Sequence, residues 1–228
     1  MNYTIISALV FGVMQIHGHA TLSTATAGEI DLVGKHLVAD RDMAVEWTRD
    51  ANLVKTLCSN DSPLWKSFDP ASVKQGTGRS AAEICAQNGL MNWYEAKAWI
   101  GVLNKHAYLG HSDWRLPRIQ QKDSSCSLHI QADQAGNTVS LGHGCLNSEP
   151  GHLFHASLDN PVYEGSACQD NCLTNHGPFS NLSGNMYWTD TEIAFDTSLV
   201  GVFDPSNDWQ DAEKKTSDLL QVWPVHAL

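Results

Sequence analysis

Residues 92–117 have the sequence NWYEAKAWIGVLNKHAYLGHSDWRLP, and this stretch decides how the rest of the chain packs. Asn92 is a favoured helix N-cap residue, and Glu95, three positions later, is placed to bond back to the cap. Apolar residues then recur at the helical period, at Ala96, Trp99, Ile100, Leu103 and Ala107. The pattern predicts a helix over 93–105 that buries one face in the core.

The segment ends in Ser112-Asp113-Trp114-Arg115-Leu116-Pro117. An arginine between two apolar residues, followed by proline, is expected to be buried or half-buried in a tight turn. A buried guanidinium without a partner is costly in free energy. We therefore expect Arg115 to pair with a carboxylate such as Glu192 or Asp113.

Short strands are predicted on both sides of this segment. Before it, a first strand is expected within 29–38, and alternation of Met43, Val45 and Trp47 predicts a half-buried strand over 40–47. After it, residues 118–180 are rich in Gly, Asn, Ser, His and Cys, which favours a long irregular region. Strands resume at 186–189, 199–203, 209–213 and 219–225. The interpretation is one α+β domain, with Trp47, Trp93, Trp99 and Trp114 in its core.

The first residues differ from the rest. Met1 to Ala20 contains no charged residue, and the stretch from Ile5 to Ile16 is mostly apolar. Small residues near Ala20 suit a signal peptidase, so residues 1–20 are predicted to be a signal peptide and 21–228 a single domain. A cut after Ala25-Thr26-Ala27, or an N-terminal strand or helix of the folded domain, stays open. No later apolar run reaches the roughly 20 residues of a membrane span, so no transmembrane segment is expected. The protein should be secreted, periplasmic or on the cell surface.

Six cysteines, an even number, favour disulfides over free thiols in an exported chain. About fifteen connectivities are open to six cysteines. We predict nearest-neighbour pairs, each closing one turn-rich segment: Cys58–Cys85, Cys126–Cys145 and Cys168–Cys172.

The formal net charge is −11, from 25 acidic and 14 basic residues. Such an imbalance argues against nucleic acid, anionic lipid or sulfated polysaccharide as a simple electrostatic partner. Many acids lie after Trp188, where they could equally form a solvated face that keeps the protein soluble.

The residues quoted from Asn92 to Ala96 and from Ser112 to Pro117, followed by Tyr187-Trp188-Thr189-Asp190-Thr191-Glu192, resemble the Legionella collagen-like adhesin C-terminal domain family, formerly a domain of unknown function. Three further motifs resemble its exported, PEP-CTERM-associated branch: 45–53, 151–154 and 177–182. The likeness runs from about Asp40 to Val225. The ending Val222-Trp223-Pro224-Val225-His226 departs from the family's usual basic close.

This resemblance implies a C-type lectin-like fold: short antiparallel sheets, one main helix and long loops. In such folds the late strands and their loops carry the binding surface. The ligand-binding residues expected from it are Trp188, Asp190, Glu192, Asp208, Trp209 and Asp211. Carboxylates there can accept hydrogen bonds from hydroxyl groups, and Trp209 offers a flat apolar surface.

No cofactor is expected, although a structural calcium ion held by Asp190, Glu192, Asp208 or Asp211 is a possibility on ligand type. Glu149-Pro150-Gly151 and Asn207-Asp208-Trp209 only partly match the calcium and sugar motifs of classical lectins. A zinc or copper site is an alternative, from His152 and His155, or from His129 and His143 near Cys126 and Cys145.

The predicted function is a non-enzymatic binding or adhesion module for an extracellular glycan or protein ligand. Hydrolase, metalloprotease and phosphate-loop motifs are missing from the sequence. Alternatives are an envelope structural or protein-interaction protein, a metal-binding protein, or an enzyme like the formylglycine-generating enzymes, which use late cysteines. Here the last cysteine is Cys172. The sequence predicts no oligomeric state.

Overall fold

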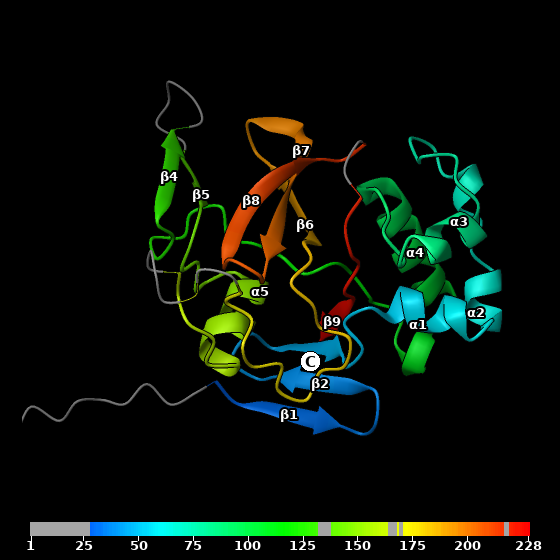
Figure 1. The fold of residues 1–228 in the computed structure, drawn as a ribbon, viewed down its shortest axis with the longest axis horizontal. Helices are drawn as coiled ribbons and strands as arrows, with labels where there is room; N and C mark the ends of the chain where they lie inside the picture. The colour runs from blue at the N-terminus through cyan, green and yellow to red at the C-terminus, as the bar shows by residue number, and fades with distance from the viewer. Residues whose placement is uncertain (1–27, 132–137, 164–167, 169–170, 217–218) are drawn as a thin grey trace, which may run out of the picture.

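The computed structural model describes residues 28–131, 138–163, 168, 171–216 and 219–228. The predicted signal peptide, residues 1–20, and the second cleavage motif at 25–27 lie outside the described residues. The described part of the chain is an α+β structure with short antiparallel sheets, as predicted, and a group of helices beside them (Figure 1). None of its helices is long and apolar enough to span a bilayer.

The first sheet brings the two ends of the described chain together. Its strands follow the order β1-β2-β3-β9, and all neighbours are antiparallel. They are β1 (Ile30–Val33), β2 (Leu37–Asp40), β3 (Val45–Thr48) and β9 (Val225–Ala227). Every residue of β3 is buried, so the half-buried strand predicted from alternation is instead covered on both faces. Figure 1 shows the C-terminus beside this sheet.

The second sheet is the meander predicted from the late strands. It consists of β6 (Tyr187–Ile193), β7 (Asp196–Asp204) and β8 (Trp209–Lys214). The strand predicted over 219–225 is mostly wrong, because Leu220 and Gln221 make only isolated bridges and β9 begins at Val225.

The region predicted to be irregular, 118–180, contains regular structure. A hairpin of β4 (Leu128–Gln131) and β5 (Thr138–Leu141) precedes α5 (Glu149–His152) and the π-helical turn η3 (Leu153–Ser157). Every residue of β4 is exposed, so no apolar alternation marks it in the sequence. A bridge between Gly142 and Gln210 joins the hairpin to β8.

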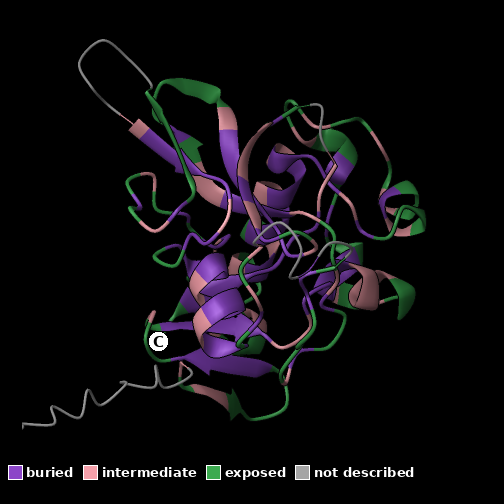
Figure 2. Cartoon of the chain, turned by 60° about the vertical axis from the view of Figure 1, so that its left-hand side comes forward, coloured by how far each residue is buried: buried purple, intermediate pink, exposed green. Residues whose placement is uncertain are grey.

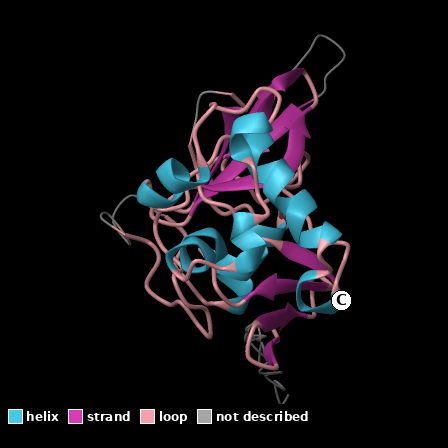
Figure 3. Ribbon diagram, turned by 90° about the vertical axis from the view of Figure 1, so that its right-hand side faces the viewer, coloured by secondary structure: helices cyan, strands magenta, loops and turns pink. Residues whose placement is uncertain are grey.

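The helix predicted over 93–105 is confirmed as α4 (Trp93–Lys105). The Asn92 side chain accepts a hydrogen bond from the Glu95 amide at 2.9 Å, and the Glu95 carboxylate accepts one from the Asn92 amide at 3.0 Å. This reciprocal cap satisfies two amides that a helix start leaves unpaired. The helical elements near α4 in the sequence gather with it on one side of the sheets, on the right in Figure 1, and Figure 3 shows the helices from that side: α1 (Leu53–Ser59), α2 (Pro63–Lys66), η1 (Pro70–Ser72), α3 (Ala81–Ala86) and η2 (Tyr108–Gly110).

Two large apolar clusters form the core. One surrounds α4 and includes Trp99 and Trp114, and the other includes Trp47 and Trp223, whose ring centroids are 4.6 Å apart. All four tryptophans predicted for the core are buried. Figure 2 shows the buried residues where sheets and helices meet, with exposed residues in the outer loops.

The disulfide prediction is confirmed, since the structure joins Cys58 to Cys85, Cys126 to Cys145 and Cys168 to Cys172. In a chain-entropy model the first bridge, spanning 27 residues, stabilises the fold by about 3–4 kcal/mol.

Candidate functional site

The predicted ligand-binding residues separate by burial. Trp188 and Asp208 are 0% exposed. Asp190, Trp209 and Asp211 are half-buried, and Glu192 is exposed. The predicted face is therefore narrower than the sequence suggested.

Trp188 belongs to the core. Its indole Nε1 donates a 2.8 Å hydrogen bond to the Met91 carbonyl, and its ring packs within the cluster around α4. A buried indole with its one donor satisfied offers no surface to a ligand. The assignment of Trp188 to the binding face is corrected to a packing role.

Asp208 is a buried connector. One carboxylate oxygen lies 2.6 Å from His155 Nε2, and the other accepts hydrogen bonds from the amides of Gly144 at 3.1 Å and Tyr163 at 3.2 Å. The other His155 ring nitrogen faces the Asn160 carbonyl at 3.3 Å, so neither is free to act as a base. Asp208 thus holds three segments together, and its assignment to the binding face is corrected.

Asp190 and Glu192 each carry a lysine partner. Lys97 bonds the Asp190 carboxylate, and Lys215 Nζ lies 2.6 Å from Glu192 Oε1. Lys215 Nζ also lies 4.6 Å from the centre of the Trp93 ring. Among the described residues, neither these acids nor Asp208 belongs to a group of three side chains placed to hold one metal ion.

Trp209 and Asp211 remain as surface groups at the start of β8. Trp209 Nε1 donates to Asp211 Oδ2 at 2.8 Å, which fixes the indole over its own strand. His143 lies edge-on to Trp209 with ring centroids 4.5 Å apart, and it stacks on Tyr163 at 4.4 Å. We call Trp209, Asp211, His143 and Tyr163 the Trp209 face. It combines three half-buried rings with one carboxylate.

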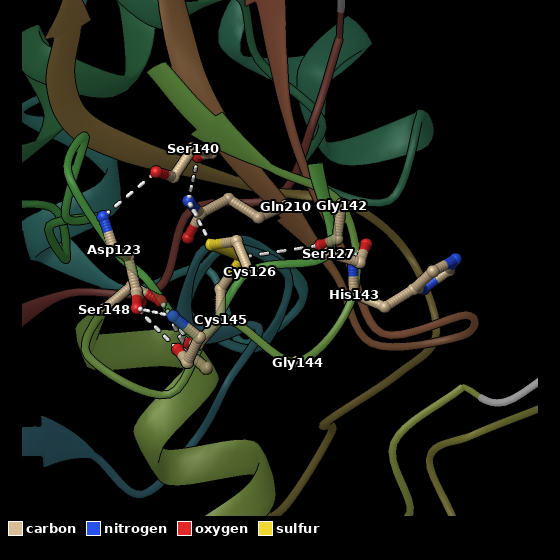
Figure 4. The surroundings of a disulfide bond; sticks show 12 residues. Asp123, Cys126, Ser127, Ser140, Gly142, His143, Gly144, Cys145, Ser148 and Gln210 are labelled. Atoms are coloured by element: carbon tan, nitrogen blue, oxygen red, sulfur yellow. Dashed lines mark hydrogen bonds between the residues drawn. A yellow bond between two sulfur atoms is a disulfide. The ribbon is translucent and has the colours of Figure 1, made fainter. Parts of the chain in front are cut away.

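The Trp209 face is anchored from beneath by the Cys126–Cys145 loop. His143 belongs to this loop, and its ring points away from the disulfide in Figure 4. Its Nδ1 lies 3.0 Å from the Asn207 carbonyl. Through His143, the loop between the two cysteines therefore supplies part of the Trp209 face.

Asp123 organises the base of that loop. Its carboxylate accepts hydrogen bonds from the Ser125 amide at 2.9 Å and the Asn147 side chain at 2.7 Å. Burial alone would raise the pKa of Asp123, but these hydrogen bonds outweigh it and lower the pKa below its usual value. The loop is thus fixed by a charged group as well as by the disulfide (Figure 4).

Comparison with known families covers most of the described region. The family model of the Lcl C-terminal domain matches residues 36–226. The chain belongs to this family. No curated protein and no solved structure matches the chain.

In this Lcl C-terminal domain, Arg115 is a structural charge with a partner that the sequence did not reveal. Its two terminal nitrogens each lie 2.7 Å from a Glu149 oxygen, in a paired arrangement. Glu149 Oε2 also accepts a hydrogen bond from the Arg118 amide at 2.8 Å. The expected partners, Glu192 and Asp113, are corrected to Glu149, whose role is therefore structural.

A second surface of this Lcl C-terminal domain is hollowed and rich in amides. The hollow has a volume of about 480 Å³. Most of its lining residues are polar: Asn52, Lys55, Thr56, Ser59, Asn60, Asn88, Asn181, Leu182, Ser183 and Gln221. We call it the amide groove. It has no aromatic lining residue, so it lacks the stacking surface that the Trp209 face offers.

Proposed function

We propose that this chain is an exported, non-enzymatic binding module with an adhesive role, and that its Trp209 face recognises a hydroxyl-rich ligand, a glycan. Membership of the Lcl C-terminal domain family supports an adhesin-like module. The C-type lectin-like fold implied by the sequence resemblance is part of this proposal. The observation that carries the site is the half-buried Trp209 ring beside the Asp211 carboxylate.

The chemistry of the Trp209 face suits a sugar. Apolar C–H surfaces of a pyranose ring can lie against an indole, and a carboxylate accepts hydrogen bonds from hydroxyl groups. The His143 and Tyr163 rings extend the apolar surface next to Trp209. Since the loop beneath is fixed by Asp123 and a disulfide, little conformational entropy would be lost on binding.

Export is supported by the cysteines. All six form disulfides, which persist in oxidising compartments. The alternative ligand of the Trp209 face is a protein, and the experiment below distinguishes a protein ligand from a glycan.

The test is a glycan array with and without calcium, followed by titration of the best glycan. Trp209→Ala should weaken binding at least about tenfold, a loss of roughly 1.4 kcal/mol, while the melting temperature stays close to that of the unaltered protein. Phe195→Ala is the matched control, because Phe195 is a 47% exposed aromatic outside the Trp209 face.

Two results would contradict this proposal, one by placing the binding site elsewhere and one by identifying a different class of ligand. If Asn60→Ala in the amide groove abolishes binding and Trp209→Ala does not, the groove is the binding site. If no glycan binds and a surface protein is retained through Trp209, the ligand is a protein. Asp208→Ala is unsuitable for this test, because the buried carboxylate supports the fold.

A further inference from the structure

Three side chains that can bind a metal ion lie close together beside the first sheet: Glu46, His111 and His226. One ligand atom from each lies within 4.8 Å of the other two. Glu46 in β3 and His226 in β9 are direct register partners. Directly paired residues of antiparallel strands point to the same face of the sheet, so the backbone itself fixes this pair.

The strongest observation is the buried His226 ring. Its side chain is 2% exposed, and Nε2 has no hydrogen-bond partner, although Glu46 Oε2 lies 3.0 Å away. The other nitrogen, Nδ1, lies 2.7 Å from the Ala227 carbonyl, which can only accept, so Nδ1 carries a proton. In the neutral ring Nε2 is then an acceptor that faces a carboxylate. Two acceptors at this distance need a cation between them, either a proton or a metal ion.

We propose that Glu46, His111 and His226 form a binding site for a divalent transition-metal ion, with zinc as the ion of best fit. Two imidazoles and one carboxylate are a ligand set that zinc takes at about 2.0–2.2 Å, with a fourth position left open. Ligand atoms of a tetrahedral zinc ion are roughly 3.3 Å apart by that geometry. The separation of Glu46 and His226 is already close to this value.

Binding requires His111 to turn. Its ring now stacks on His226 with centroids 3.8 Å apart, whereas a metal ion lies in the plane of each imidazole that binds it. His111 is half-buried and directly follows the short turn η2, so one side of its ring faces solvent rather than the core. Trp114, edge-on to His226 at 4.7 Å, forms an apolar wall. Asp113 Oδ1, 3.9 Å from His226 Nδ1, adds negative charge nearby.

The consequence would be a metal staple between distant parts of the chain. An ion there would link β9 at the C-terminal end to β3 near the N-terminal end, and both to the segment after α4. Because the unfolded chain does not assemble these three ligands, the bound ion would stabilise the fold. The site shares no residue with the Trp209 face, so it stands independently of the proposed glycan binding.

The experiment is zinc titration of the untagged, chelator-treated full chain by calorimetry, with cobalt as a spectroscopic substitute. We expect one zinc ion per chain, the intense visible absorption of tetrahedral cobalt, and a melting temperature about 5–10 °C higher at a hundredfold excess over Kd. Altering even the outer partners of metal ligands costs about 10–100-fold in affinity. Glu46→Gln, His111→Gln and His226→Gln should each cost at least that much.

His152→Gln is the matched control, because His152 also lies beside two carboxylates, 3.4 Å from Asp40 and 3.8 Å from Asp42. Its zinc affinity should equal that of the unaltered chain. If His226→Gln fails to fold, the half-buried His111 variant and the isosteric Glu46→Gln decide the matter. The proposal is overturned if the Kd for zinc is millimolar or weaker, in which case the cation between His226 and Glu46 is a proton. It is also overturned if His152→Gln is the one variant that loses zinc binding.

Discussion

The Arg115–Glu149 pair permits a quantitative prediction. Arg115→Met keeps an unbranched apolar side chain and removes the guanidinium. The Glu149 carboxylate then loses both hydrogen bonds from Arg115 and keeps the one from the Arg118 amide, at 2.8 Å. Breaking a buried ion pair from one side costs about 3–5 kcal/mol, because a charge is left without compensation. Here 18% of the Arg115 side chain and 11% of the Glu149 side chain are exposed, so water offsets part of that cost.

We therefore expect Arg115→Met to reduce the free energy of unfolding by about 3 kcal/mol. For a domain of this size that is a fall in melting temperature of about 6–12 °C. The assay is thermal and urea denaturation followed by circular dichroism. Arg41→Met is the matched control, because Arg41 pairs with Asp31 at 2.8 Å where both side chains are about half exposed. Its effect should stay below about 1 kcal/mol.

A double-mutant cycle separates the pair from the stranded charge. Arg115→Met combined with Glu149→Met removes both charges and replaces them with apolar groups. The double variant should be more stable than the sum of the single effects predicts, since no uncompensated carboxylate remains. If Arg115→Met melts within a degree or two of the unaltered protein, the ion pair does not support the fold and the reasoning is wrong.

Three further predictions follow from local contacts. The hydrogen bond with Asp40 raises the pKa of His152, so its stabilisation is present at low pH and lost as pH rises through that pKa; His152→Gln should lower the melting temperature more at pH 5 than at pH 8, and equal effects would contradict this. Burial would raise the pKa of Glu95, but hydrogen bonds from Thr77 and Asn92 lower it, so Glu95→Gln should destabilise the domain near pH 7 and progressively less as pH falls below about 4, as measured by urea unfolding. Gly151→Ala should strongly destabilise the domain, because the added Cβ would lie 2.0 Å from the Cys145 carbonyl oxygen. In Gly101→Ala, within α4, the added Cβ meets nothing within 4 Å, so this variant should be more stable by about 0.5–1 kcal/mol. Similar melting temperatures for the two variants would refute this contrast.

Local signals in the sequence were sufficient for the features that depend on near neighbours. The α4 boundaries follow from a capping box and a helical period within one short segment. The nearest-neighbour choice among the open disulfide connectivities is confirmed, and so is the burial of the four predicted core tryptophans.

Features that depend on distant segments were not predictable in the same way. Glu149 lies 34 positions after Arg115, beyond any local pattern. The buried state of Asp208 depends on His155 and on two backbone amides from other segments. The β4–β5 hairpin was missed because its first strand is exposed throughout, so no apolar face distinguishes it.

The acidic C-terminal third illustrates how tertiary contacts change the meaning of composition. Asp190, Glu192 and Asp208 each face a basic or imidazole partner contributed by another element. Paired carboxylates of this kind hold strands and loops in place. Because their charges are partly neutralised, the negative electrostatic potential that they present to an approaching ligand is smaller than their number suggests. Asp211 instead accepts a hydrogen bond from a neutral group, the indole of Trp209. Recognition by the Trp209 face should consequently depend on one aromatic surface and one carboxylate. Glycan affinity should therefore change little with ionic strength, in contrast to the steep salt dependence expected of a broad acidic patch.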